Sequence, residues 1–389
     1  MDAQLFANAL SDKYIFNLKK LGYKYPELDM SEFISILKES VYISLPLRDF
    51  NGNSCVYMSS ALKPAEKTYK SLMYRPGSGS YGLLPMENEI GASLSIESID
   101  FSRESVRKIL SGRAPEDLAE KRIYCMKQAI EFICNRENRI NEENIYTLYM
   151  LACGSLAEYE CRLPEGEHYR NDTVYVVNAA GNVEHSGLHH EKLSEYMADL
   201  IDFINGNNIQ DSLAKACIIH FYMAYLHPHF DGNGRMARLM HQWFLVQSDF
   251  PSALFVSFSG LIESSRKKYY DAYTLCENNM KISGVMDLSA FIAYFYKEIY
   301  LKLDSPGNQG ASTDKAREFI SSGGVTKKEK ELWEFILSAY GTKEFSTKQL
   351  EKDFGNAAYA TIRSFVMKFE QEGLLEVKNY SNRRAYRIC

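Results

Sequence analysis

The sequence lacks the features that mark secreted, membrane-spanning and disulfide-stabilised proteins. No basic segment followed by an apolar core stands near Met1, so we expect no secretion signal. The longest apolar stretches, such as 217–226, are too short to cross a bilayer. Eight cysteines occur without a Cys-x-x-Cys pair, which favours reduced thiols over a disulfide framework. We therefore expect a cytoplasmic protein that does not associate with membranes.

An excess of one charge is missing as well. The net charge of −5 gives the chain no general attraction to nucleic acid or to anionic lipid. Its 46% hydrophobic and 24% charged residues are typical of a soluble globular protein, and 27 tyrosines with 21 phenylalanines argue against disorder. A length of 389 residues predicts two or three domains.

Segment 227–238, HPHFDGNGRMAR, combines the groups that bind a polyphosphate and deprotonate a hydroxyl. His227 supplies a base that titrates near neutral pH, and Asp231 is a hard oxygen ligand of the kind that Mg²⁺ accepts beside phosphates. The Gly-Asn-Gly turn brings backbone N–H groups close to an anion, and two arginines follow three residues apart. A plain glycine turn between two solvated helices would explain neither the histidine nor the arginine spacing.

This segment resembles the signature of the Fic family, His-x-Phe-x-(Asp/Glu)-Gly-Asn-Gly-Arg-x-x-Arg. Seven of its eight specified positions agree, and the exception is the phenylalanine, which is replaced by His229. In the family that phenylalanine anchors the loop in the core. A histidine would do so poorly without hydrogen bonds, so Phe230 is expected to take over the anchoring role.

The resemblance implies transfer of AMP from ATP, with Mg²⁺, to a hydroxyl side chain of a target protein, which can be the protein itself. The site residues that it implies are the base His227, the Mg²⁺ ligand Asp231, the α-phosphate contact Asn233, the anion-hole glycines Gly232 and Gly234, and the β- and γ-phosphate contacts Arg235 and Arg238. It also leaves a homodimer open, because dimers are frequent in the family.

A second motif, built on Ser93 and Glu97, resembles the family's inhibitory segment, Ser/Thr-x-x-x-Glu-Gly/Asn. Its last position is Ser98 here. In the family this glutamate pairs with the second signature arginine, and an arginine held by a carboxylate cannot also hold phosphate. A serine-rich helix with an exposed glutamate would show the same pattern. Beside the signature, however, we expect an inhibitory helix near 88–110.

The hydrophobic pattern predicts a mainly α fold. Apolar residues recur at helical spacing in 118–134, and helices are expected on both sides of the signature, over 211–226 and 235–247. His220, within the first of these, is expected to be a core histidine. A weak hairpin signal at 173–185 looks like the family's flap, which lies over the active site and pairs with the target.

The chain is expected to divide into four parts. These are an N-terminal region of unclear role (1–85), a Fic-like catalytic domain (86–303), a linker (304–325) and a C-terminal unit (326–389). A helix is expected over 2–21, and turns are expected at Asn51-Gly52, 76–79 and 178–182. The sequence pattern of the last unit predicts three helices and then two strands around a basic turn, an arrangement similar to a winged helix-turn-helix. Its 12 Lys and Arg against 9 Asp and Glu give +3, which allows contact with DNA, while contact with a protein is equally open.

Adenylyl transfer restrained by Glu97 is the leading function. Three others stay open: removal of AMP from proteins at the same site, transfer of another phosphate-containing group, and DNA-binding regulation in which the Fic-like domain acts as a sensor.

Overall fold

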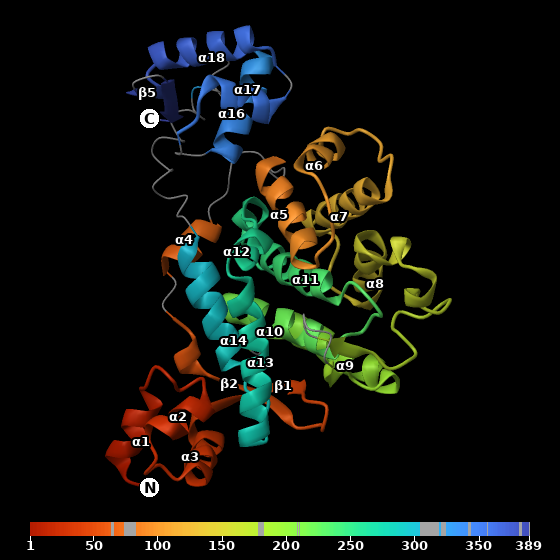
Figure 1. Ribbon diagram of the computed structural model, residues 1–389, viewed down its shortest axis with the longest axis vertical. Helices are drawn as coiled ribbons and strands as arrows, with labels where there is room; N and C mark the ends of the chain where they lie inside the picture. The colour runs from red at the N-terminus through yellow and green to blue at the C-terminus, as the bar shows by residue number, and fades with distance from the viewer. Residues whose placement is uncertain are drawn as a thin grey trace. The chain divides into compact units, whose positions relative to one another are not determined.

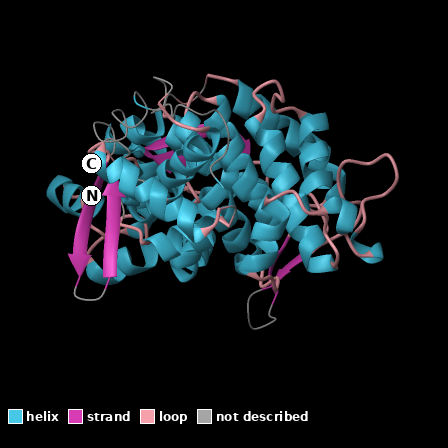
Figure 2. Cartoon of the chain, turned by 90° about the horizontal axis from the view of Figure 1, so that it is seen from above, coloured by secondary structure: helices cyan, strands magenta, loops and turns pink. Residues whose placement is uncertain are grey.

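The computed structural model of the protein describes residues 1–63, 66–73, 83–177, 183–207, 209, 211–303, 319, 324–340, 344–355, 357–380 and 383–388. The turns that the sequence predicts at 76–79 and 178–182, and most of the linker 304–325, lie outside these residues. Helices dominate, and the strands form three separate antiparallel pairs (Figure 2). The mainly α fold is therefore confirmed.

The chain begins with three short helices, each with a side chain that accepts a hydrogen bond from its first turn. They are α1 (Ala3–Leu10), α2 (Leu18–Lys24) and α3 (Met30–Ile36), capped by Asp2, Asn17 and Asp29, and a π-helical turn follows at Leu37–Val41. The sequence pattern predicts one helix over 2–21, which is wrong because the Asn17 cap starts a new helix. Their inward faces form a buried cluster that includes Leu18, Leu21 and Phe33.

A hairpin joins these helices to the rest of the unit. Strands β1 (Tyr42–Arg48) and β2 (Ser54–Met58) pair around the expected Asn51-Gly52 turn. Val56 in β2 donates its N–H to the carbonyl of Met286 at 2.9 Å, and its own carbonyl accepts from Leu288 N at 2.8 Å. Met1–Ala65, Ile90–Asp249 and Phe258–Lys302 accordingly form one compact unit.

The segment expected to be one inhibitory helix near 88–110 is two helices, α5 (Leu83–Ile96) and α6 (Arg103–Leu110). Ser98 ends the first of them with a φ of +58°. Its N–H bonds the carbonyl of Ser95, and the next N–H, that of Ile99, bonds the carbonyl of Leu94. This pair of bonds is the Schellman motif, which terminates a helix at a left-handed residue.

The two helices that flank the signature lie at the centre of the unit and pack side by side (Figure 1). They are α10 (Ser212–Leu226) and α11 (Asn233–Gln247), and most of their residues are buried. His220 in α10 is fully buried, with Nε2 2.8 Å from Tyr269 Oη, so its expected place in the core is confirmed.

Further helices and one hairpin surround this pair. The helices are α7 (Leu118–Cys134), α8 (Glu142–Ala152), α9 (Leu193–Asn205), α12 (Phe258–Ser264), α13 (Arg266–Ser283) and α14 (Ser289–Tyr294), which continues in π and 3₁₀ turns to Lys302. Strands β3 (Tyr175–Val177) and β4 (Val183–Ser186) confirm the expected hairpin.

A second compact unit comprises Glu66–Glu89, Phe250–Ser257 and Leu303–Cys389, and includes α4 (Glu66–Met73). Its C-terminal part contains α16 (Lys327–Ala339), α17 (Thr347–Phe354), α18 (Tyr359–Gln371), β5 (Leu375–Tyr380) and β6 (Arg383–Ile388). These elements bury a cluster of their own around Trp333, Phe365 and Phe369. Among the described residues of both units, no helix is long and apolar enough to cross a membrane.

Candidate functional site

The signature begins where α10 ends. His227 follows the last residue of that helix in a left-handed conformation, with φ of +54° and ψ of +57°. Its Nδ1 lies 3.1 Å from the carbonyl oxygen of Ala224. A carbonyl can only accept, so Nδ1 carries the proton and Nε2 holds the lone pair of the neutral ring. The local backbone thus selects the tautomer that a general base needs.

The two signature glycines stand where the backbone leaves no room for a side chain. Gly232 precedes α11 with a φ of +82°, and a Cβ there would lie 2.6 Å from Cys153 Sγ. A Cβ on Gly234 would lie 2.5 Å from Glu97 Oε1. The first turn of α11 is therefore closely approached by a carboxylate, as expected for a helix N-terminus that attracts anions.

Arg235 follows Gly234 in this turn, and its side chain is only 7% exposed. Its Nη2 pairs with Asp231 Oδ2 at 3.2 Å, and the Asp231 side chain is 62% exposed. The Nε of Arg235 is buried and has no hydrogen-bond partner among the described residues. A buried donor without a partner is costly, so this guanidinium is suited to an anion that completes its bonds.

Arg238 lies one turn further along α11 and is enclosed. Its Nη2 donates to Glu97 Oε1 at 2.8 Å, and its Nε and Nη2 donate to Ser93 Oγ, each at 3.2 Å. Burial opposes the charge of the carboxylate, but Arg238 outweighs it and lowers the pKa of Glu97. The structure therefore brings together the two sequence motifs, which are 141 residues apart at their point of contact.

Asn233 holds the signature loop closed. Its Oδ1 accepts from the backbone N–H of His229 at 3.0 Å, and its Nδ2 donates to the carbonyl of the same residue at 2.7 Å. The expected contact of Asn233 with the α-phosphate stays a prediction, because both polar groups of this side chain already bond the loop.

The position of the family's phenylalanine is filled by a buried histidine. His229 is 0% exposed and stacks on Tyr149, with ring centroids 3.7 Å apart. Neither of its ring nitrogens has a hydrogen-bond partner among the described residues, and burial lowers its pKa to about 3. The expectation that Phe230 would replace the anchor is wrong, since the neutral imidazole occupies the core and Phe230 stays partly exposed.

One residue of the site carries no sequence signal of its role. Arg170, which is only 2% exposed, donates from Nε to the carbonyl of His227 at 2.7 Å. Its other nitrogens donate to the carbonyls of Asp172 and Leu188, each at 2.5 Å. These two residues stand at the base of the β3–β4 hairpin, so one buried guanidinium fixes the hairpin to the backbone of the candidate base.

The signature offers Mg²⁺ one carboxylate, that of Asp231. Among the described residues there is no group of three or more His, Cys, Asp or Glu that could hold a metal ion. A single exposed carboxylate, Asp231, suits an ion that takes its remaining ligands from water and phosphate. The unpartnered Nε of Arg235 suits the phosphates themselves, so the residues present fit the magnesium nucleotide.

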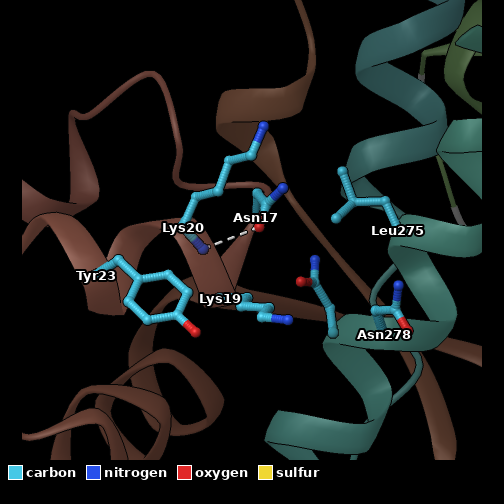
Figure 3. A pocket seen from close by; sticks show the side chains of 7 residues that line it. Asn17, Lys19, Lys20, Tyr23, Leu275 and Asn278 are labelled. Carbon is cyan, nitrogen blue, oxygen red and sulfur yellow. Dashed lines mark hydrogen bonds between the residues drawn. The ribbon is translucent and has the colours of Figure 1, made fainter.

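A separate recess lies between α2 and α13 (Figure 3). It is lined by Asn17, Lys19, Lys20, Tyr23, Leu275, Asn278 and Asn279. Asn279 joins the two helices, since its Oδ1 accepts from Leu18 N at 3.1 Å and its Nδ2 donates to the carbonyl of Phe16 at 3.0 Å. This lining contains neither a carboxylate nor an imidazole, so we assign it no part in the chemistry.

Comparison with known proteins matches one part of the chain to a family. Residues 140–245 match the model of the Fic/DOC family. This part of the chain is therefore similar to the Fic domain. It contains the whole signature and Arg170, whereas Glu97 precedes the matched residues.

Two relatives that the chain resembles are proteins named protein adenylyltransferase fic-1. The one from Caenorhabditis briggsae is 29% identical over 109 residues, and the one from Caenorhabditis elegans is 28% identical over 109 residues. In each case the match covers 28% of this chain and 19% of the relative, so the chain spans about a fifth of the length of these curated relatives. A crystal structure of a Fic family protein from Desulfovibrio desulfuricans G20 is similar with a TM-score of 0.48 and 18% identity, covering 100% of this chain and 97% of the other.

Proposed function

We propose that the protein transfers AMP from ATP to a hydroxyl side chain of a protein and that Glu97 restrains this activity. The observation that carries the proposal is the contact of the second signature arginine, Arg238, with the Glu97 carboxylate at 2.8 Å. It places a negative group beside Gly234, where the helix N-terminus would otherwise receive phosphate. The similarity of the Fic domain to proteins named adenylyltransferases supports AMP as the transferred group.

The phosphates of ATP would lie along the first turn of α11, beside Gly232 and Gly234. Arg235 would complete its unpartnered Nε with a phosphate oxygen, and Arg238 would hold the terminal phosphate once released from Glu97. Asp231 would hold Mg²⁺, which when bound neutralises charge on the phosphate oxygens.

The proposed reaction is an in-line displacement at the α-phosphorus. The hydroxyl oxygen of the target forms a bond to that phosphorus while the bond to the bridging oxygen breaks, and pyrophosphate leaves. Nε2 of His227 takes the hydroxyl proton, which the Nδ1–H bond to Ala224 prepares it to do. Arg170 keeps the histidine backbone in place during this step.

The proposal is tested by labelling the protein with ATP that is radioactive in either the α- or the γ-phosphate, in the presence of Mg²⁺. Replacing Glu97 with Gly frees Arg238 to bind phosphate. Removal of a competing charge-assisted pair of about 1–3 kcal/mol should make productive ATP binding about tenfold to a hundredfold stronger. Self-modification by the α-label should rise accordingly in Glu97→Gly, and the γ-label should not be retained.

Asp100→Gly is a matched control, because it removes an exposed carboxylate three residues further along the chain. It should label like the wild type. Equal or weaker α-labelling in Glu97→Gly would reject the restraint by Glu97. Loss in that variant of an activity that releases AMP from a modified protein would instead support AMP removal as the function, and ATP binding without transfer in every variant would support a sensor domain in a DNA-binding regulator.

We also propose the domain boundaries 86–303 for catalysis and 326–389 for a winged helix module. Three helices followed by a hairpin with its own core support the second assignment. Its partner would be DNA or another protein, and a homodimer of the whole chain is compatible with the same arrangement.

A further inference from the structure

The C-terminal end of α5 meets the N-terminal end of α13 beside the inhibitory glutamate. Arg266, the first residue of α13, donates from Nη1 to the carbonyl of Ser95 at 3.3 Å and from Nη2 to Ser98 Oγ at 3.4 Å. Both acceptors belong to the last turn and the cap of the helix that carries Glu97. A side chain outside the Fic domain therefore bonds the segment that occupies Arg238.

The placement of Arg266 is unfavourable for its own helix. The first turn of α13 contains no acidic residue and holds three cations in succession, whereas a helix N-terminus prefers negative charge. The two neighbouring cations are paired, Lys267 with Asp271 at 2.7 Å and Lys268 with Glu298 at 2.8 Å. Arg266 instead offers its charge to the carbonyl end of α5, where a cation is favourable.

Ser98 explains why that helix end needs support. It occupies the left-handed position of the Schellman motif, with φ of +58°, which glycine and asparagine adopt more readily than serine. Its hydroxyl is also one of the two acceptors of Arg266. The contact offsets a conformation that the backbone alone does not favour and keeps Glu97, one residue earlier, in reach of Arg238.

We infer that Arg266 is a positioning residue for inhibition, which clamps the end of α5 through Ser95 and Ser98 so that Glu97 stays on Arg238. This inference rests on the proposed function and adds to it the residue that sets the strength of the restraint. Disturbing the clamp raises transfer without any change in the signature.

The test compares Arg266→Ala with Lys267→Ala, each in the wild-type and the Glu97→Gly backgrounds. Because two weak bonds to the helix end are lost, transfer from α-labelled ATP should rise about threefold to tenfold in Arg266→Ala, and ATP should bind more tightly by the same factor. In the Glu97→Gly background Arg266→Ala should add nothing, because no inhibitory group remains to be positioned. Lys267→Ala, which removes an 86% exposed cation, should have no effect in either background.

Ser98→Gly provides a second, independent arm. Glycine adopts the left-handed conformation without cost, but it also removes the Oγ that accepts from Arg266. The variant is therefore compared in the Arg266→Ala background, where that acceptor is already unused and inhibition should be restored. Arg266→Lys, which keeps the charge but not the forked geometry, should lie between wild type and Arg266→Ala. Arg266→Lys keeps the test valid if Arg266→Ala does not fold.

The outcomes separate this inference from the proposed function. Activation by Glu97→Gly but not by Arg266→Ala would overturn the clamp alone. Equal activation by Arg266→Ala in both backgrounds would also overturn it, because the effect would not pass through Glu97. Absence of transfer in Glu97→Gly would overturn the proposed function, and the clamp would then be judged by ATP binding.

Discussion

The two ends of the signature differ in what already occupies them. At the base end, which comprises His227, Asp231 and Arg235, the carboxylate is 62% exposed and the Arg235 Nε lacks a partner among the described residues. At the Arg238 end, which comprises Gly234 and Arg238, the arginine side chain is 2% exposed and is bonded to Ser93 and Glu97. Two buried arginines three residues apart on one helix thus pair with different carboxylates, Arg235 with the exposed Asp231 and Arg238 with Glu97. In the proposed function, the segment that carries Ser93 and Glu97 would restrain ATP binding through Arg238.

Replacing His227 with Ala tests the base end and should have the largest effect. Loss of a general base costs on the order of 10²–10⁴ in rate, while ATP binding should change little because the phosphate contacts remain. The effect is measured in the Glu97→Gly background by the rate of α-label transfer, with calorimetry for ATP binding. Near-normal labelling by the double variant would remove His227 from the reaction.

The comparison between the two arginines is sharpened by measuring each alanine variant with and without Glu97. Arg235→Ala should weaken ATP binding in both backgrounds, because the Nε that would bind a phosphate oxygen has no partner among the described residues. Arg238→Ala should weaken it strongly only in Glu97→Gly, by about tenfold to a hundredfold for a charge-assisted contact of about 1.5–3 kcal/mol.

The wild-type background supplies the control for this pair of variants. There Arg238 is already bound to Glu97, so its loss should change ATP binding little. Thermal unfolding identifies any loss of stability from removing this buried side chain. Equal effects of the two arginines in both backgrounds would show that the ends of the signature are not distinct.

The residues of the signature could be recognised in the sequence, whereas only some of the contacts made to them could be predicted. Residues 227–238 are consecutive, so their chemistry can be read directly from the chain. The resemblance also singled out Ser93 and Glu97, and in the structure both bond Arg238, while their inhibitory role stays a prediction. The contacts of Arg170 and Arg266 were not predicted, because both side chains bind mainly backbone carbonyls. Every residue has a backbone carbonyl, so no sequence pattern indicates such a contact.

Errors in the fold have similarly local causes. The expected inhibitory helix over 88–110 ends at Ser98, which adopts a left-handed backbone conformation. The sequence does not reveal this end, because the residue at that position is neither glycine nor asparagine. Of the β1–β2 hairpin, only the turn at Asn51-Gly52 was expected. Strand β2 also bonds the loop before α14, and the sequence gives no sign of a contact between segments so far apart. His229 was expected to be a poor anchor, yet stacking on Tyr149 lets a neutral ring fill the site.

His229 also predicts a pH dependence of stability at the base end. Its pKa is about 3 in the folded protein and near 6.5 when unfolded. Between these values the unfolded chain binds a proton that the folded chain does not, so this residue lowers stability as the pH falls from 6.5 toward 3, by about 1.4 kcal/mol per unit. His229→Phe should therefore stabilise the protein by about 2 kcal/mol at pH 5 and by less at pH 8.

Urea unfolding at pH 8, 6 and 5 measures this difference. His241, whose pKa burial also lowers to about 3, stays in the variant and should preserve part of the slope. His189→Asn, at an exposed histidine, should leave the slope unchanged. A pH dependence that is identical in His229→Phe and wild type would mean that the buried ring exchanges its proton freely.

The smallest effect is expected from deleting residues 326–389. The buried cluster of this segment is formed by its own helices and strands, around Trp333, Phe365 and Phe369, and none of the signature contacts described above involves it. An independently folded module can be removed without disturbing a site built elsewhere, so the truncated protein should transfer α-label within about twofold of the full chain. The gain from Glu97→Gly should also be retained, because Arg238, Ser93 and Arg266 are all present in the truncated chain. Circular dichroism establishes that it is folded. A folded truncation that binds ATP but no longer transfers AMP, in either background, would show that the C-terminal unit completes the site. Control of transfer would then no longer be confined to the Arg238 end of the signature.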